Sequence, residues 1–170
     1  MKILVLNGSP RPNKNTAAFV QRFTKGAEDA GHQVEVLQVG TMKINGCIGC
    51  EFCKGNSGGE CAIKDDMQKV YSSLEKADIL VLASPVYYWS LTSQLQATIS
   101  RFYATNIPHP KKYALILTSA SDDVYDSILA QYHRILDYFD AIDMGIFTAY
   151  GSERHQEEKL QEIYDFGNRL

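Results

Sequence analysis

The first 31 residues read as a buried strand, a polar loop and a helix, and this order constrains the fold more than any other feature of the chain. Residues 3–6 form a continuous apolar run, which is typical of a strand that is covered on both faces. Residues 7–16 are polar, and a helix is predicted from about Thr16 to Ala30, with Gly31 as its stop signal. This unit predicts the start of an open α/β sheet.

The loop in this unit has the composition of an anion site. The N-terminus of a helix offers free N–H groups and a dipole that favours negative charge. Ser9, Asn15 and Thr16 add hydroxyl and amide groups, and Arg11 and Lys14 add positive charge. An ordinary loop with Asn15 as the helix cap is the alternative, but the position after the first strand favours a phosphate site. Neither G-x-x-x-x-G-K-[ST] nor G-x-G-x-x-G is present, so we expect no nucleoside triphosphate or dinucleotide in this loop.

Apolar and polar segments alternate along the rest of the chain. Strands are predicted at residues 33–39, 78–83, 113–118 and 144–148, helices at 67–76, 91–103, 124–139 and 153–169, and a proline-bounded loop at 106–110. Asp65 and Asp66 are expected to cap the first of these later helices. The alternation predicts an α/β flavodoxin-like three-layer sandwich with a five-stranded parallel sheet in the order 2-1-3-4-5. We expect one domain over residues 1–170, with residues 40–64 as a cysteine-bearing insertion loop.

Composition excludes several partners. A net charge of −3 gives no electrostatic footprint for nucleic acid. No apolar run approaches the length of a membrane span and no signal peptide opens the chain, so we expect a cytoplasmic protein without a membrane partner. In a reducing compartment, four cysteines favour metal or redox chemistry over a disulfide framework.

An aromatic loop follows the predicted third strand. Its residues are Pro85, Val86, Tyr87, Tyr88 and Trp89. The loops after strands one and three diverge at the ligand crevice of such a sheet, so three aromatic rings there suit a flat heteroaromatic ligand. The alternative is that the rings pack under neighbouring helices or across a dimer interface. One phosphate site beside one stacking site fits the shape of FMN.

The two loops together carry a family resemblance. Gly8-Ser9-Pro10-Arg11 with Asn15-Thr16, followed by Ser84-Pro85-Val86-Tyr87, resembles the NAD(P)H-dependent FMN reductase branch of the flavodoxin-like superfamily over nearly the whole chain. The resemblance implies FMN phosphate binding by Ser9, Arg11, Asn15 and Thr16, and an isoalloxazine ring lined by Pro85, Val86, Tyr87, Tyr88 and Trp89. The third loop of this family is often glycine-rich, whereas residues 119–123 here contain no glycine, so only Ser119 is assigned there. The resemblance also implies NAD(P)H as co-substrate and a homodimer or homotetramer.

The four cysteines form the compact motif Cys47-x2-Cys50-x2-Cys53-x7-Cys61. Closely spaced thiolates of this kind can hold a [4Fe–4S] cluster. The motif with the following Asp65-Asp66-Met67 resembles that of the iron–sulfur flavoproteins, which use FMN and such a cluster. A four-thiolate zinc site and a loop without metal remain alternatives.

Three functions are compatible with these features. The first is an FMN-dependent oxidoreductase that takes hydride from NAD(P)H and passes electrons to a quinone, a flavin or another small acceptor. The second is an iron–sulfur flavoprotein electron carrier fed by a ferredoxin-like protein. The third is a non-enzymatic thiol or metal redox sensor on the same scaffold. The scattered histidines are expected at surface or capping positions, although His109 could border the ring site, and Asp122, Asp123 and Asp126 make only a weak metal site.

Overall fold

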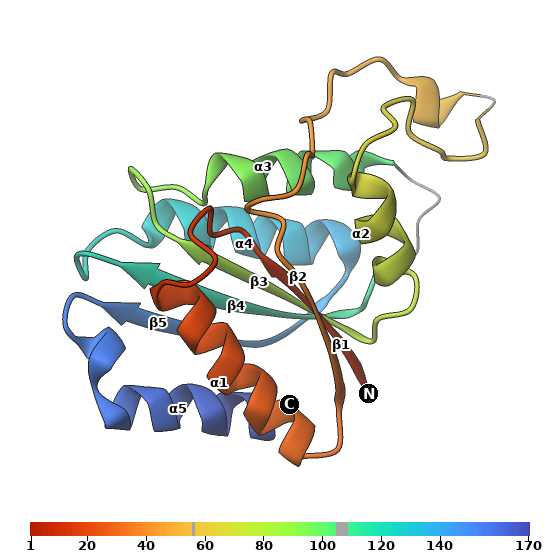
Figure 1. The fold of residues 1–170 in the computed structure, drawn as a ribbon. Helices are drawn as coiled ribbons and strands as arrows, with labels where there is room; N and C mark the ends of the chain where they lie inside the picture. The colour runs from red at the N-terminus through yellow and green to blue at the C-terminus, as the bar shows by residue number, and fades with distance from the viewer. Residues whose placement is uncertain (56, 105–108) are drawn as a thin grey trace.

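The computed structural model describes residues 1–55, 57–104 and 109–170, and its centre is a parallel sheet between two layers of helices (Figure 1). The strands are β1 (Lys2–Asn7), β2 (Gln33–Leu37), β3 (Ile79–Pro85), β4 (Lys112–Ser119) and β5 (Ile142–Tyr150). The helices are α1 (Asn15–Asp29), α2 (Met67–Leu74), α3 (Ser93–Ser100), α4 (Asp126–Phe139) and α5 (Glu157–Asn168). Short 3₁₀ turns are η1 (Phe52–Lys54), η2 (Arg101–Tyr103) and η3 (Glu153–His155). The proline-bounded loop expected at 106–110 lies largely outside the described residues.

The sheet confirms the predicted flavodoxin-like topology. Its strand order is β2-β1-β3-β4-β5, and each neighbouring pair is parallel. The order reverses between β1 and β3, because β2 lies on the outer side of β1. The loops after β1 and β3 therefore leave the same edge of the sheet in opposite directions, which is where such folds bind ligands.

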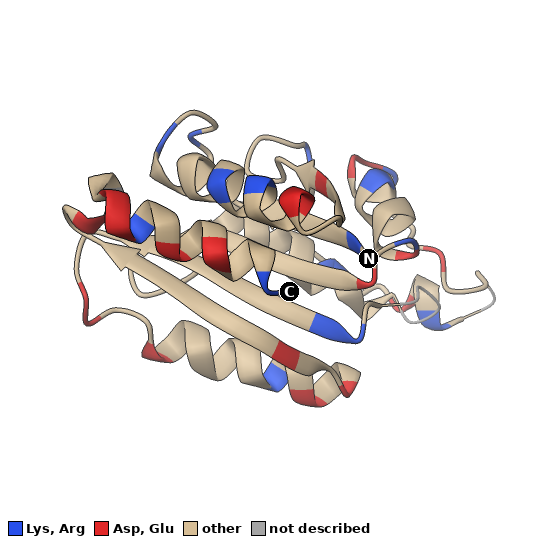
Figure 2. Cartoon of the chain, turned by 90° about the horizontal axis from the view of Figure 1, so that it is seen from below, with Lys and Arg blue, Asp and Glu red and all other residues tan. Residues whose placement is uncertain are grey.

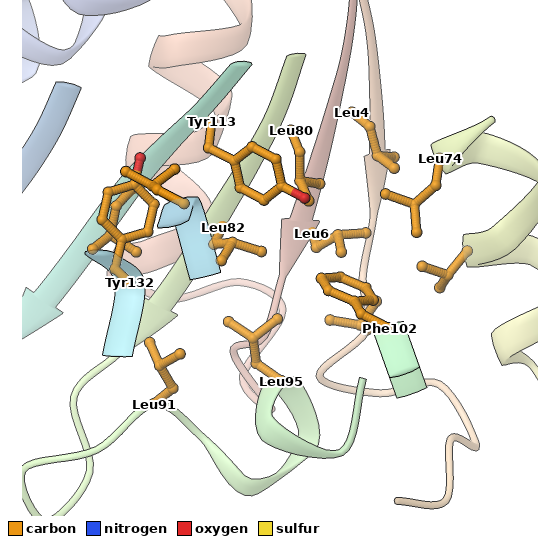
Figure 3. Packing of buried hydrophobic residues seen from close by; sticks show 14 of the residues in the cluster. Leu4, Leu6, Leu74, Leu80, Leu82, Leu91, Leu95, Phe102, Tyr113 and Tyr132 are labelled. Carbon is orange, nitrogen blue, oxygen red and sulfur yellow. The ribbon is translucent and has the colours of Figure 1, made fainter. Parts of the chain in front are cut away.

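Both faces of the sheet are covered, and this explains the continuous apolar strands. Helices α1 and α5 lie on one face, and α2, α3 and α4 lie on the other (Figure 1). In β1, Ile3 and Val5 belong to the α1/α5 layer, whereas Leu4 and Leu6 face the opposite layer. Figure 3 shows that second layer, with leucines of β1 and β3 gathered beside Leu95 and Phe102.

Two details of the helix ends differ from the sequence prediction. The helix expected at 91–103 begins at Ser93, because Thr92 acts as its N-cap and accepts a hydrogen bond from the Leu95 N–H at 3.3 Å. Its last turn is the 3₁₀ turn η2. Asp65 caps α2, since its Oδ1 accepts a hydrogen bond from the Met67 N–H at 3.0 Å. Asp66 makes no side-chain cap; its carboxylate accepts from the Lys43 N–H at 2.8 Å instead.

Figure 2 shows lysines and arginines interspersed with acidic residues along the helices, so neither sign of charge dominates in that view. Among the described residues, no helix combines the length and apolar character that a membrane crossing requires.

Candidate functional site at the carboxyl edge of the sheet

The first loop, which we define as residues 7–14, is fixed by hydrogen bonds from three directions. The Gly8 N–H donates to the Ala83 carbonyl at 2.8 Å, and the Gly8 carbonyl accepts from Thr92 Oγ1 at 2.7 Å. Within the loop, the Ser9 N–H donates to Asn7 Oδ1 at 3.0 Å. Because β3 and the cap of α3 supply these partners, the backbone of the loop is held in place before any ligand binds.

The chain after β2 closes the back of the first loop. Gln38 Nε2 donates to the Ser9 carbonyl at 2.7 Å. Gly40 lies so close that a Cβ atom there would be 2.0 Å from the Ser9 carbonyl oxygen, which only glycine avoids. Sequence reasoning missed both residues, since their partner lies about 30 positions earlier in the chain.

The start of α1 offers the expected anion-binding groups. Lys14 is the N-cap residue and provides no side-chain cap, and Asn15 is the first helical residue, so Asn15 does not act as the cap. Within the described chain, the backbone N–H groups of Asn15, Thr16 and Ala17 have no hydrogen-bond acceptor. Arg11 and Lys14 are exposed beside them. The combination of free N–H groups and two cations suits a phosphate.

The hydroxyl groups predicted to bind phosphate are buried and already paired. Ser9 Oγ lies 3.2 Å from both the backbone nitrogen and the carbonyl oxygen of Arg11. Thr16 Oγ1 lies 2.8 Å from Thr118 Oγ1 at the end of β4. If Thr118 donates to Thr16, the Thr16 hydroxyl keeps its own proton for an anion. Thr118 is a further residue that sequence reasoning missed, because only the sheet register brings β4 to α1.

The second loop, residues 86–90, forms a tight hairpin. The Tyr87 N–H donates to the Ser90 carbonyl at 3.0 Å, and the Ser90 N–H returns a bond to the Tyr87 carbonyl at 3.1 Å. Tyr88 and Trp89 occupy the tip with φ angles of 51° and 58°. Positive φ at both central residues is the feature of a type I′ turn, which ordinarily carries Asn-Gly.

The hairpin limits which backbone groups could meet a ring. The Val86 N–H is taken by the Thr118 carbonyl at 2.7 Å, and the Tyr87 N–H is used within the turn. Among the described residues, the N–H groups of Tyr88 and Trp89 have no acceptor. Pro85 is buried as the last residue of β3, whereas the three aromatic side chains after Val86 are exposed.

The first and second loops meet. The guanidinium carbon of Arg11 lies 5.8 Å from the centre of the Tyr87 ring, within range of a cation–π contact. Both loops stand at the same end of the sheet (Figure 1). A positively charged site suited to an anion therefore lies next to an exposed aromatic surface, as the strand order requires.

The third loop is occupied by its own contacts. Ser119 Oγ lies 2.6 Å from the Tyr125 hydroxyl and donates to the Ser121 carbonyl at 2.5 Å. Burial raises the pKa of Tyr125, although the Ser119 hydrogen bond opposes the shift, so the phenol stays protonated at neutral pH. Ser119 thus stabilises this loop whether or not it contacts a ligand.

His109 does not border the ring site, which was the alternative considered for that residue beside a surface or capping position. Its ring stacks on Phe139 at 4.1 Å, and Nδ1 lies 3.3 Å from the hydroxyl of Tyr113. Tyr113 is near the start of β4, so His109 lies at the opposite edge of the sheet from the two loops. Burial lowers the pKa of His109 to about 4. The predicted order of elements was consistent with this position, because a loop between a helix and the next parallel strand lies at the amino edge of the sheet.

The cysteine loop, residues 38–66, extends beyond α2 and the end of α3 (Figure 1). Cys47 and Cys50 are exposed, and Cys53 and Cys61 are half-buried. Across residues 1–55, 57–104 and 109–170, no three Cys, His, Asp or Glu side chains are close enough together to hold a metal ion, and this includes the aspartates at 122, 123 and 126. Four thiols still form a donor set that suits a soft metal, and the Gly49 N–H already donates to Cys47 Sγ at 3.5 Å.

A buried arginine holds the base of the cysteine loop. Arg101 is 1% exposed and donates to the Asn45 carbonyl at 2.9 Å, to the Ile63 carbonyl at 3.0 Å and to Asp65 at 3.2 Å. Hydrogen bonds from the Asn45 and Met67 N–H groups and the charge of Arg101 outweigh burial, so the pKa of Asp65 is lowered. Sequence reasoning missed Arg101, which reads there as one more polar helical residue.

Comparison with known proteins finds a matching family model and curated relatives. A family model described as NADPH-dependent FMN reductase matches residues 1–156. An iron–sulfur flavoprotein of Archaeoglobus fulgidus is 30% identical over 175 residues, covering all of this chain and 79% of that protein. A second, from Methanocaldococcus jannaschii, is 34% identical over 101 residues, which are 59% of this chain and 51% of that protein. Apart from the first, the iron–sulfur flavoproteins that we compared match over only about half of their length.

Solved structures confirm the fold. An NAD(P)H:quinone oxidoreductase from Methanothermobacter marburgensis superposes with a TM-score of 0.73 at 17% identity, covering 100% of this chain and 96% of that one. At this level of identity, the likeness shows the flavodoxin-like fold and does not assign individual site residues.

Proposed function

Because the chain belongs to the NADPH-dependent FMN reductase family and is an FMN-dependent oxidoreductase that uses NAD(P)H, we propose that it holds FMN across the first and second loops and delivers electrons to a quinone or another small acceptor. The contact between Arg11 and Tyr87 carries this proposal, since it joins an anion site to an aromatic surface at one edge of the sheet. Bound FMN would supply the chemistry by accepting hydride and releasing electrons.

The first loop is proposed to hold the FMN phosphate. Arg11 supplies positive charge in the first loop, and the free N–H groups of Asn15 and Thr16 supply donors at the start of α1. The buried Ser9 fixes the backbone of Arg11, and Thr118 orients the Thr16 hydroxyl. Hydrogen bonds within the protein already fix the backbone of the first loop, so FMN binding requires little further ordering of that loop.

The second loop is proposed to line the isoalloxazine ring. Tyr87 lies nearest the first loop, and the turn after it offers the N–H groups of Tyr88 and Trp89 to the polar edge of a ring. Pro85 and Val86 fix the start of the turn through β3 and the Thr118 carbonyl. Ser119 is proposed as a more distant support on the third loop.

The test is an FMN titration followed by steady-state turnover. Added FMN should raise the melting temperature, and the holoprotein should oxidise NADH or NADPH in the presence of a quinone. Arg11→Met should weaken FMN affinity by roughly 10- to 150-fold, since a charge-assisted hydrogen bond contributes roughly 1.5–3 kcal/mol. Arg134→Met, which changes an exposed side chain of α4, is the matched control and should leave the FMN affinity unchanged. An FMN titration that left the melting temperature unmoved, with neither nicotinamide oxidised, would refute the proposal.

A second candidate function is that of an iron–sulfur flavoprotein electron carrier with a [4Fe–4S] cluster on Cys47, Cys50, Cys53 and Cys61 and a ferredoxin-like partner. The observation in its favour is the four-cysteine motif together with relatives that carry the name iron–sulfur flavoprotein. The donor chemistry fits, but the thiols are not gathered, so binding would require the loop to close. Iron and labile sulfide after anaerobic purification, lost in Cys50→Ser, would support a cluster, whereas zinc or an iron-free protein would argue against it.

We further propose a cytoplasmic, single-domain protein that forms a homodimer or homotetramer. Exposed aromatic side chains on the second loop and exposed Ile48 and Phe52 on the cysteine loop are the kind of surface that self-association covers. Light scattering on the purified protein would measure the number of subunits, and a monomer would refute this part.

A further inference from the structure

The end of α3 and the turn η2 lie next to the cysteine loop and hold it at points beside the cysteines (Figure 1). Ser100 Oγ accepts a hydrogen bond from the Cys47 N–H at 3.0 Å. The Tyr103 hydroxyl donates to Glu51 Oε1 at 3.1 Å, and the ammonium group of Lys54 lies 4.2 Å from the centre of the Tyr103 ring. These three contacts use backbone groups and neighbouring side chains, so they leave the sulfur atoms available for a ligand.

Arg101 joins the two sides of the cysteine loop. Its Nη1 donates to the Asn45 carbonyl at 2.9 Å, and its Nη2 donates to the Ile63 carbonyl at 3.0 Å. Asn45 lies two positions before the first cysteine of the chain, and Ile63 lies two positions after the last. All four cysteines therefore lie between two points of the backbone that one guanidinium group holds together.

Fold stability alone does not account for this arginine. Arg101 is 1% exposed, and its Nε has no acceptor among the described residues. A buried ion pair is often no more stabilising than apolar side chains of similar volume, so a guanidinium is a poor way to fill a core. What a guanidinium adds is a rigid planar fork of N–H donors, which can hold two carbonyl groups at a set separation.

The four cysteines are divided between two environments. Cys53 and Cys61 are partly buried and pack against the core, whereas Cys47 and Cys50 are exposed. A metal ion that binds all four thiols must bring them together, and closing a stretch of chain costs entropy. Because Arg101 already ties the two sides of the loop, only the chain between the held points remains to be ordered.

We propose that Arg101 is a positioning residue for a soft metal bound by the four cysteines. Its fork fixes both sides of the cysteine loop and thereby raises the affinity of the thiols for the metal. Ser100 is a second, weaker support that acts through the Cys47 N–H. This inference rests on the proposed four-thiolate site, and it adds to that site two residues from outside the cysteine motif.

The test is an anaerobic Co²⁺ titration of the reduced, iron-free protein, followed by the visible absorption of the Co²⁺–thiolate complex. In a variant, the metal must supply the ordering that the lost hydrogen bonds supplied. Arg101→Met loses two bonds to carbonyls and should weaken the Co²⁺ affinity about 25-fold, and Ser100→Ala loses one bond and should weaken it about 5-fold. Ser93→Ala, which changes an exposed serine at the other end of α3, is the matched control and should leave the affinity unchanged.

Two further variants separate positioning from fold stability and from charge. Ile163→Ala removes a fully buried side chain from the opposite core layer, so it also destabilises the fold, but it should leave the Co²⁺ affinity unchanged. Arg101→Lys keeps the positive charge and lacks the planar fork, so it should lose affinity as Arg101→Met does. An affinity restored by lysine, or an equal loss in Ile163→Ala, would overturn the inference.

The remaining outcomes separate this inference from the site on which it rests. If wild type, Arg101→Met and Ser100→Ala bind Co²⁺ equally well, the inference is overturned while the four-thiolate site stands. If the reduced wild-type protein binds neither Co²⁺ nor Zn²⁺ and takes up no iron and sulfide, the site and the inference are overturned together. The FMN titration described above is independent of both results.

Discussion

Replacing Asp65 with asparagine should destabilise the fold more than any other single charge removal suggested by the structure. Asp65 and Arg101 form an ion pair at 3.2 Å with side chains that are 8% and 1% exposed. The carboxylate also accepts hydrogen bonds from the N–H groups of Asn45 at 2.9 Å and Met67 at 3.0 Å. One side chain thus connects the base of the cysteine loop, the start of α2 and the end of α3.

The magnitude follows from what each variant leaves behind. Asp65→Asn leaves a buried guanidinium with the carbonyls of Asn45 and Ile63, and its Nε has no partner in the described chain. Removing one partner of a buried pair costs about 3–5 kcal/mol, and this case belongs at the upper end. Arg101→Met leaves a carboxylate that still accepts two backbone N–H groups, so its cost should be roughly 2–3 kcal/mol. The double variant should cost less than the sum.

The pH dependence has a definite sign. Asp65 has a lowered pKa in the folded protein, so the folded state binds this proton less readily than the unfolded chain, whose carboxyl titrates near pH 4. The stabilisation of the fold by ionised Asp65 is therefore fully present above about pH 4, and it is lost as the pH falls through the lower pKa that Asp65 has in the folded state. The difference in unfolding free energy between wild type and Asp65→Asn should shrink on acidification below about pH 4.

Urea unfolding followed by circular dichroism measures these free energies, and hydrogen exchange shows where the fold loosens. Faster exchange in Asp65→Asn should be concentrated in the cysteine loop and the start of α2. The matched control is Asp137→Asn, which breaks an exposed pair with Arg134 and should cost ~0.5 kcal/mol or less. Equal costs for the two asparagine variants, or strict additivity in the double variant of Asp65 and Arg101, would refute the reasoning.

Three further predictions concern the site and the core. Gly40→Ala should push the first loop out of place and weaken FMN affinity more than 10-fold in a titration, whereas Gly46→Ala, whose added methyl meets nothing closer than 3.7 Å, should not. Thr118→Val should lower FMN affinity about 5-fold by removing the partner of Thr16, at about 1 kcal/mol for one hydrogen bond, and an unchanged Kd would contradict that role. Because His109 has a pKa of about 4 when folded, wild-type stability should fall by about 3 kcal/mol between pH 6.5 and 4, and urea unfolding of His109→Phe should show no such slope.

The fold could be predicted from the sequence because its signals are local. A continuous apolar run such as residues 3–6 identifies a strand buried on both faces, and the alternation of strands and helices leaves few topologies open. The meeting of Arg11 and Tyr87 followed from that topology, since the loops after β1 and β3 must leave the same edge. The helix ends were less predictable, as Thr92 and Asp66 show, because caps depend on which side chain turns inward.

The supporting contacts of the site could not be predicted, because each joins residues far apart in the chain. Thr118 reaches Thr16 only through the register of β4, and Gln38 reaches the first loop only through the path of the chain after β2. The turn at Tyr88 was hidden for another reason: its aromatic residues contradict the preference of a type I′ turn, so local propensity pointed away from it. Arg101 offered no signal because a buried charge resembles a surface charge in sequence.

Helix α3 connects the two chemically distinctive parts of the molecule, and its ends are anchored independently. At its start, the Thr92 hydroxyl donates to the Gly8 carbonyl at 2.7 Å and the Thr92 N–H donates to Ser84 Oγ at 3.1 Å, so the start is anchored to the first loop and to the end of β3. At its end, Ser100 Oγ accepts from the Cys47 N–H at 3.0 Å, next to the buried Arg101. Eight helical residues span about 12 Å, which is short enough for the parts to be neighbours. Because separate hydrogen bonds hold each end, we expect a rearrangement of the cysteine loop around its base to leave the geometry of the first loop, which Thr92 holds, unchanged.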